Sequence, residues 1–229
     1  MRDRTILTGR NNDVLLLNKK ILEKFPGELK VFYSADKVKT EEGVDNAETI
    51  HLSPEYLNSL NTAGLPLAKL ELKVGCPVMI LRNLAPSQGV CNGTRAVVTQ
   101  MGRQMLEVRL LNGTEEGKRI YHIFIIFLLT LSTTGNTIFI PHITLDSAES
   151  EFGFIMQRRQ FPVRLAFAMT INKSQGQSVN HVGLDFENAP FSHGQAYVAF
   201  SRCTSASRIH VFNNSDQPAT KNVVYKSVL

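Results

Sequence analysis

A polar cluster follows an apolar run at Thr170–Gly176, whose sequence is TINKSQG. Its hydroxyls, amides and lysine ammonium are groups that bind phosphate oxygens, and its glycine gives the backbone freedom to turn. Two interpretations stay open on these residues alone. The cluster is either a solvated turn at the end of a strand, or a strand-edge loop that holds a phosphate or a charged polymer.

The segment 192–204, SHGQAYVAFSRCT, predicts a helix that carries Gln195 and Arg202. These residues are two helical turns apart, so they share one face, and the small Ala199 between them leaves room for a ligand. An alternative is that Gln195 closes the helix start, because Ser192 and Gln195 have the capping-box spacing. By spacing alone, Arg202 is an ordinary exposed arginine.

The sequence contains no phosphate-binding P-loop, which requires Gly-x4-Gly-Lys-Ser/Thr. The only Gly-Lys pair, at 117–118, lacks the first glycine and precedes Arg119. Asp185 and Glu187 suggest a magnesium-binding strand end, but without a P-loop a solvent-facing loop is the better interpretation. We therefore predict no metal ligands in this chain.

The composition is that of a globular protein, with 229 residues of which 43% are hydrophobic. The net charge of +5 weakly favours a phosphate-bearing partner. The three cysteines are far apart and match no metal-ligand spacing, which favours a reducing compartment. No secretory signal is present, and the apolar run 123–131 is too short to span a bilayer, so we expect an intracellular protein without a membrane partner.

Periodicity predicts the elements that must position these residues. Val14, Leu17, Ile21 and Phe25 have helical spacing, Asn12 or Asp13 can cap the start, and a Pro-Gly pair ends the helix, which predicts a helix over 11–25. A short strand follows at 29–33.

Strand patterns at 161–171, 181–186 and 208–213 alternate with the helix at 192–204, which predicts a mostly parallel α/β sheet. The alternation in 161–171, FPVRLAFAMTI, fits one strand covered on both sides by helices. Ligands of such sheets bind beyond the carboxyl ends of strands, where the polar cluster lies. Between Leu70 and Leu145, short alternating runs cut by Gly, Asn and Pro predict a small all-β, barrel-like unit.

The segments LTGRNNDVLLLN, GLPLAKLELKVGCPVMILRNL, GVCNGTR, RRQFPVRLAFAMTINKSQGQS and GQAYVAFSRC, in this order, resemble the carboxy-terminal part of the petite-integration-frequency family of DNA helicases, including copies in Helitron transposons. The resemblance implies a RecA-like α/β second motor lobe interrupted by a small Src-homology-3-like β-barrel. We assign residues 1–66 and 155–229 to the lobe and 67–154 to the barrel. An apolar segment at about 120–136 is atypical of the family.

The resemblance also implies partners and roles. ATP and Mg²⁺ would bind with the help of a P-loop lobe, in cis or in trans, and the DNA would be single-stranded. The expected location is the nucleus or the mitochondrion, with roles in DNA repair, recombination and telomere maintenance. The implied residues are Thr170, Asn172, Lys173 and Ser174 for the DNA backbone, Gln175, Gly176 and Tyr197 for the nucleotide, and Gln195 and Arg202 as catalytic residues at the γ-phosphate.

Two departures bear on this resemblance. Many relatives have His where this chain has Asn172, and arginine is commoner at the position of His142. The leading hypothesis is the second motor lobe of an ATP-dependent 5′-to-3′ DNA helicase, inactive by itself because it lacks a P-loop. The alternatives are a non-catalytic single-stranded nucleic-acid-binding module and an inactive transposon relic.

Overall fold

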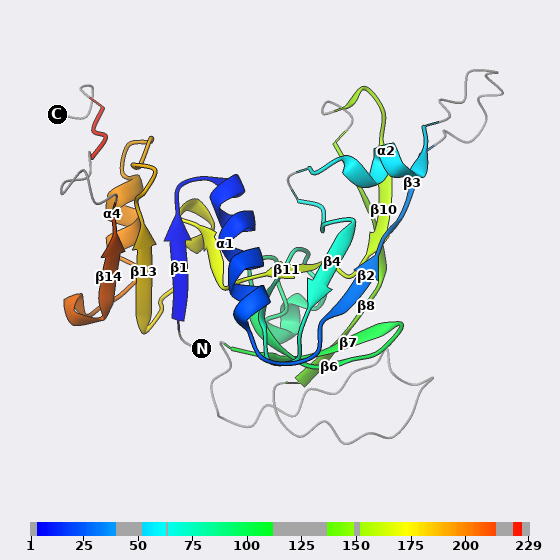
Figure 1. The fold of residues 1–229 in the computed structure, drawn as a ribbon, viewed down its shortest axis with the longest axis horizontal. Coiled ribbons are helices and arrows are strands. Elements are labelled where there is room, and N and C mark those ends of the chain that lie inside the picture. The colour runs from blue at the N-terminus through cyan, green and yellow to red at the C-terminus, as the bar shows by residue number, and fades with distance from the viewer. Residues whose placement is uncertain are drawn as a thin grey trace. The chain divides into compact units, whose positions relative to one another are not determined.

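The computed structural model describes residues 4–39, 52–62, 64–111, 137–148, 152–213 and 222–225 (Figure 1). The chain divides into two compact units, one formed by Met1–Pro26 with Leu165–Leu229 and the other by Gly27–Arg164. These boundaries differ from those we assigned at 67 and 154. The difference arises because β2 (Lys30–Tyr33) pairs with β4 (Lys69–Leu72), and β10 (Met156–Gln160) pairs with both β3 (Ala35–Val38) and β9 (Ile143–Asp146). The apolar segment 120–136 lies outside the described residues.

The first unit contains a four-stranded sheet in the order β12-β1-β13-β14, in which every pairing is parallel. This confirms the predicted parallel α/β sheet. Thr8 of β1 is in register with both Thr170 and Asp185, so the carboxyl ends of three strands meet at one edge. The bounds are β1 Arg4–Thr8, β12 Ala168–Thr170, β13 His181–Asp185 and β14 Ile209–Phe212.

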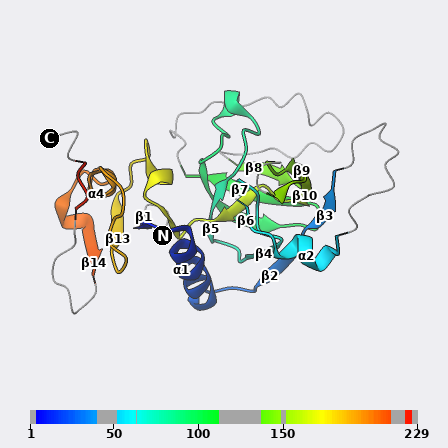
Figure 2. The same ribbon diagram turned by 90° about the horizontal axis from the view of Figure 1, so that it is seen from above.

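Two helices lie on opposite faces of this sheet, α1 (Asn11–Lys24) and the short α4 (Gln195–Phe200) (Figures 1 and 2). The helix α1 confirms the prediction for 11–25. The expected cap is wrong, because the cap residue is Arg10, without a side-chain hydrogen bond, and Asp13 accepts a hydrogen bond from Asn188 instead.

The buried row of α1 also differs from the expected one. It consists of Val14, Asn18 and Leu22, whereas Leu17 and Ile21 are half-buried. These three residues are four apart, so they form a single row along the helix. A polar side chain therefore lies in the middle of the apolar stripe.

The expected single strand at 161–171 is wrong. Val163–Leu165 forms β11 in a sheet of the second unit, whereas β12 belongs to the parallel sheet, and Ala166 and Phe167 lie between them. β11 is buried only at Val163 and β12 is buried throughout, but in the sequence large residues still alternate with smaller or polar ones across the break. Periodicity cannot show which sheet a strand joins.

The second unit is built of short, mostly antiparallel strands, which confirms the short strands expected between 70 and 145. Its sheets are β11-β5-β6-β7-β8, β3-β10-β9 and β2-β4. The Src-homology-3-like barrel stays a prediction. The remaining bounds are α2 Pro54–Ser59, β5 Pro77–Ile80, η1 Pro86–Gln88, β6 Arg95–Met101, β7 Met105–Leu110, β8 Thr137–Pro141 and β9 Ile143–Asp146.

A buried ion pair lies in the second unit. Arg158 of β10 and Asp36 of β3 have side chains that are 0% and 1% exposed, and Nη2 of Arg158 lies 2.6 Å from Oδ2 of Asp36. The guanidinium also donates to the carbonyl oxygens of Leu57, Leu60 and Pro66 at 2.9, 3.1 and 3.1 Å. It thus fixes the end of α2 against the strands, in the fully hydrogen-bonded state that a buried charge requires.

Candidate functional site

The predicted loop begins where β12 ends. Asn172–Ser174 forms a single turn of 3-10 helix, η3. The backbone N–H of Lys173 donates to Oγ1 of Thr170 at 3.4 Å, and Oγ of Ser174 donates to the carbonyl of Ile171 at 2.6 Å. Gly176 follows with a φ of 76°, a conformation that side-chain-bearing residues rarely adopt. Local hydrogen bonds therefore give the loop a defined shape.

These hydrogen bonds separate the predicted loop residues into two groups. Thr170 and Ser174 are buried, and their hydroxyls already bond within the loop. The members of the other group are exposed to solvent: Asn172, Lys173, Gln175 and Gly176.

Arg202 lies against this loop. Its Nη1 donates to the carbonyl oxygens of Ser174 and Gln177, both at 3.3 Å. Its Nε donates to the carbonyl of Val198 at 3.0 Å, and its Nη2 to Oγ of Ser201 at 2.8 Å. Among the described residues, no carboxylate forms an ion pair with Arg202. A half-buried guanidinium without a carboxylate partner in this part of the chain thus lies beside the loop.

The expected continuous helix face shared by Gln195 and Arg202 is wrong. The helix α4 ends at Phe200, so Arg202 lies beyond its end. The shorter helix turns the arginine toward the loop through its bond to Val198 and the two loop carbonyls. Arg202 therefore reaches the site from the turn that follows α4.

Gln195 is 2% exposed at the first turn of α4. The expected capping box is absent, because the cap residue is Gly194 without a side-chain bond, and Oε1 of Gln195 accepts from the N–H of Phe191 at 3.0 Å. Nε2 of Gln195 is buried and has no hydrogen-bond partner in the described part of the chain. A buried unpaired donor costs about 1–3 kcal/mol, so this position favours a bound acceptor such as a phosphate or water oxygen.

The same amide lies near the carboxyl end of β1. A Cβ atom on Gly9 would come within 3.8 Å of Nε2 of Gln195 and within 3.5 Å of the Phe191 ring. The absence of a side chain at Gly9 thus leaves space next to the unpaired donor. Gln195 belongs to the carboxyl edge of the sheet, where ligands of this fold bind.

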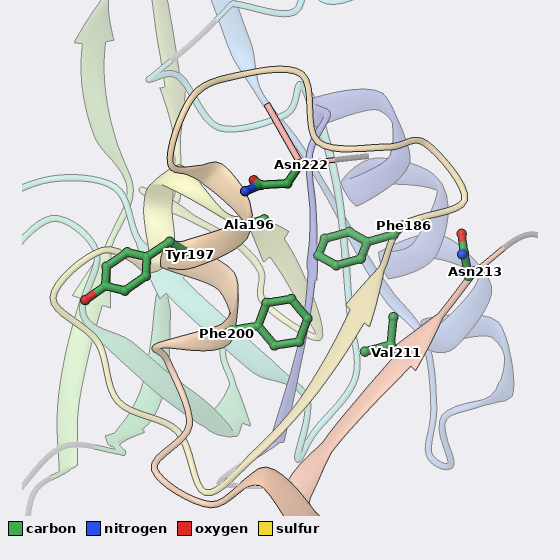
Figure 3. A pocket seen from close by; sticks show the side chains of 7 residues that line it. All are labelled: Phe186, Ala196, Tyr197, Phe200, Val211, Asn213 and Asn222. Carbon is green, nitrogen blue, oxygen red and sulfur yellow. The ribbon is translucent and has the colours of Figure 1, made fainter. Parts of the chain in front are cut away.

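The structure does not bring Tyr197 to this site. Tyr197 is 77% exposed and borders an apolar hollow of about 670 Å³ (Figure 3). Positions two apart on a helix point in nearly opposite directions, so Tyr197 and Gln195 cannot face one ligand together. The residues that line the hollow are Phe186, Ala196, Tyr197, Phe200, Val211, Asn213 and Asn222.

Sequence reasoning missed Asn18. Its Nδ2 donates to the carbonyl of Ala168 at 3.0 Å, and its Oδ1 accepts from the N–H of Ala168 at 2.9 Å. A signal for it was present, because Asn18 follows Val14 by four residues within a leucine-rich run. A polar residue in an apolar row has a partner, and this partner is the strand that leads into the loop.

The described residues offer phosphate-binding groups but no metal-ligand set. Within them, no group of three or more His, Cys, Asp or Glu side chains could hold a metal ion. Oδ1 of Asp185 accepts from the N–H of Glu187 at 3.2 Å, which is a local turn. A guanidinium such as that of Arg202 and an amide such as that of Gln195 are donors of the kind that phosphate oxygens accept, whereas the carboxylates among the described residues do not form a magnesium site. In the same part of the chain, no helix is long and apolar enough to span a membrane.

Comparison with known proteins identifies the class first. A family model for the 2B domain of DNA helicase Pif1 matches residues 55–101, and a model described as Helicase matches residues 144–224. The chain is thus related to DNA helicases through both units.

The sequence relatives identify the family. ATP-dependent DNA helicase PIF1 of Rattus norvegicus is 33% identical over 91% of this chain, and that of Homo sapiens is 30% identical over 91%. The chain therefore belongs to the Pif1 family of DNA helicases. It covers 27% of the length of each of these relatives.

Solved structures show the same fold. A structure of Pif1 helicases coordinating at forked double-stranded DNA aligns with a TM-score of 0.65 at 24% identity, covering 100% of this chain and 43% of that chain. Bacteroides Pif1 bound to single-stranded DNA aligns with a TM-score of 0.62 at 23% identity, covering 100% and 44%. The fold is that of a Pif1 helicase, whose α/β part is RecA-like.

Proposed function

We propose that this chain is the second motor lobe of an ATP-dependent 5′-to-3′ DNA helicase, and that its activity requires a P-loop lobe supplied in cis or in trans. The observation that carries the proposal is the contact of Arg202, whose charge is unpaired among the described residues, with the loop at 170–177. Family membership supports it, and the lack of a P-loop in this sequence is the reason that a separate P-loop lobe is required.

Arg202 acts on the nucleotide through its charge. A guanidinium fork neutralises the negative charge that spreads over the phosphate oxygens during phosphoryl transfer. The present partners of Arg202 are neutral carbonyls and a hydroxyl, and hydrogen bonds to phosphate are stronger than bonds to neutral acceptors. Arg202 therefore exchanges these partners for the γ-phosphate when the other lobe presents it.

This exchange links the nucleotide to the DNA. Nη1 of Arg202 binds the carbonyls of Ser174 and Gln177, which flank the exposed end of the loop. When the guanidinium turns to the phosphate, it releases these carbonyls and the loop changes its position. Asn172 and Lys173 contact the DNA backbone from this loop, while the hydroxyls of Thr170 and Ser174 preserve its shape.

The remaining roles concern the nucleotide. ATP with Mg²⁺ supplies the phosphoryl group whose hydrolysis drives movement along the strand. Gln195 donates its free amide N–H to a terminal phosphate oxygen, and Gln175 and Gly176 lie nearer the phosphates than the DNA-binding residues do. The P-loop lobe provides the metal ligands. The exposed position of Tyr197 beside the apolar hollow gives no support to a nucleotide contact there.

A non-catalytic module that binds single-stranded nucleic acid is the second candidate, and the lack of a P-loop in this chain favours it. In that case Arg202 only shapes the loop. Binding dominated by phosphate contacts weakens steeply as salt rises. For both candidates we expect a location in the nucleus or the mitochondrion, and cell fractionation tests this location.

Reconstitution distinguishes these functions. The isolated chain should show no ATPase activity, and DNA-stimulated ATPase should appear when a separately purified P-loop lobe of a Pif1 relative is added. Arg202→Ala should lower this rate by about 10³ to 10⁵ because the charge at the γ-phosphate is lost. Arg208→Ala, at an exposed arginine of η4 (Ala206–Arg208), is the matched control and should retain the rate.

Each other outcome has a definite meaning. ATPase activity of the isolated chain contradicts the proposal. Salt-sensitive DNA binding without ATPase in the mixture supports the binding module. The lack of a cooperative unfolding transition supports the transposon relic.

A further inference from the structure

The strand that leads into the loop lies at the edge of the parallel sheet. The strand β12 has β1 on one side, and no further strand pairs with it in the described residues. The N–H of Ile6 bonds to the carbonyl of Phe167 at 2.9 Å, and the N–H of Ile171 bonds to the carbonyl of Thr8 at 3.0 Å. The polar groups of Ala168, opposite Ile6, are left for the outer edge of β12.

A single side chain satisfies both of these outer groups. The amide of Asn18 donates to the carbonyl of Ala168 and accepts from its N–H, and the residue is 5% exposed. Asparagine carries a donor and an acceptor on one short planar group, whereas Asp offers acceptors only and Leu offers neither. The side chain of Asn18 thus takes the place of a neighbouring strand.

The position of this contact suits control of the loop. Ala168 precedes Thr170 by two residues, which is roughly 7 Å along a strand. The helix that carries Asn18 begins just after β1, and the carbonyl of Thr8 in β1 accepts from Ile171 at the loop start. The start of the loop is therefore fixed by hydrogen bonds to β1 on one side of the chain and to α1 on the other.

We propose that Asn18 is a positioning residue for the nucleic-acid loop, and this inference rests on the function proposed above. Asn18 prevents β12 from sliding along its own axis relative to α1. The turn η3 then holds Asn172 and Lys173 in a fixed position and keeps the Ser174 carbonyl within reach of Arg202. An edge strand held on one side only is free to slip, and a slip in register moves every following side chain.

The experiment compares two substitutions at position 18 with two controls in the full chain. Asn18→Leu removes both hydrogen bonds at similar volume, and Asn18→Asp removes the donor alone. Asn12→Asp places the same charge at an exposed position of the same helix. Val182→Ala truncates a buried side chain of β13, which β1 separates from β12 in the sheet, and destabilises the sheet.

Three quantities are measured for each variant. Amide hydrogen exchange is followed over 168–177 and, as a reference, over 181–185. The affinity for a fluorescent oligothymidine is measured at one low salt concentration, and the free energy of unfolding is measured in urea. Affinities are compared at a temperature at which all variants are folded.

Both Asn18 variants should raise exchange over 168–177 by roughly tenfold or more relative to 181–185, since buried polar groups of the strand lose their partner. Their oligothymidine affinity should fall about fivefold or more. Val182→Ala should lose stability without a selective rise in loop exchange or a loss of affinity, and Asn12→Asp should change neither.

Two results overturn the proposal. One is that exchange in the Asn18 variants rises equally over 168–177 and 181–185. The other is that Val182→Ala, at equal stability, loses as much oligothymidine affinity as the Asn18 variants do. If Asn18→Leu does not fold, Asn18→Asp gives the decision. If the unaltered chain fails to bind oligothymidine, the proposed function fails, and the exchange ratio still decides whether Asn18 holds the loop.

Discussion

The two units use the same side chain in opposite ways. In the second unit, Arg158 is fully buried, faces the carboxylate of Asp36 and donates to three backbone carbonyls. In the first unit, Arg202 is half-buried and binds neutral acceptors only, as far as the described residues extend. Arg158 donates six hydrogen bonds and Arg202 donates four, but among the described residues only Arg158 of the two has a carboxylate partner.

The presence of a counter-ion separates a structural arginine from a functional one. A guanidinium whose charge is already neutralised by a carboxylate gains little free energy from binding a phosphate. Removal of such a guanidinium leaves the buried carboxylate without a partner. A guanidinium on carbonyls loses little when it moves to an anion. Three measurements test this contrast, from the largest expected effect to the smallest.

Arg158→Met should have the largest effect. It leaves Asp36 buried without a partner, so the free energy of unfolding should fall by about 3–5 kcal/mol. Urea titration followed by circular dichroism measures this loss. The double variant Arg158→Met with Asp36→Leu should recover part of it, because no lone charge remains. If the free energy of unfolding of Arg158→Met fell by less than about 1 kcal/mol, the contrast between Arg158 and Arg202 would not hold.

Arg202→Met should change stability far less. Its hydrogen bonds join half-exposed groups that water can replace, so we expect a loss of about 1 kcal/mol in the same titration. The reconstituted ATPase should be lost although the chain stays folded. If Arg202→Met proves as destabilising as Arg158→Met, then Arg202 is a structural residue and the proposed function loses its physical basis.

Breaking the exposed ion pair of Lys39 and Asp146 should change the free energy of unfolding least. Their side chains are 45% and 39% exposed and lie 2.9 Å apart, so Lys39→Ala should cost less than about 1 kcal/mol at neutral pH. This variant sets the scale for an ion pair in water, against which the buried pair is judged.

The effect of Lys39→Ala should depend on pH. The hydrogen bond from Lys39 holds the pKa of Asp146 below its usual value of 3.8. A carboxyl group whose pKa is lowered by folding stabilises the protein above its unfolded pKa and loses this contribution as pH falls through the folded value. Urea titrations of both proteins at pH 7 and near pH 3 should therefore converge at the acid end, and a constant difference would contradict the assignment.

The sequence predicted local structure well because helix and strand periods are local signals. The helix at 11–24, the strands β13 and β14 and the parallel sheet all follow from such patterns. The order of motifs also indicated the polar loop and Arg202, whose guanidinium donates to the Ser174 carbonyl of that loop in the structure. Their roles stay predictions.

Contacts between distant residues were not predictable in this way. Arg158 and Asp36 are separated by 122 positions, and Asn18 and Ala168 by 150. No periodicity links such pairs. In the sequence, an arginine that forms a buried ion pair cannot be distinguished from any other arginine. The break at Ala166 and Phe167 was missed because alternation continues through it.

The place of β1 in the sheet has a consequence for the order in which the protein forms. This strand is synthesised before the other strands of its sheet but lies between β12 and β13, and its bond from Thr5 to Phe167 spans 162 residues. At ribosomal speeds of about 5–20 residues per second, β1 waits roughly 10 to 30 s for its neighbours. The contiguous unit at 27–164 is synthesised within that interval, so β1 gains its native neighbours only after the whole of that unit has been made.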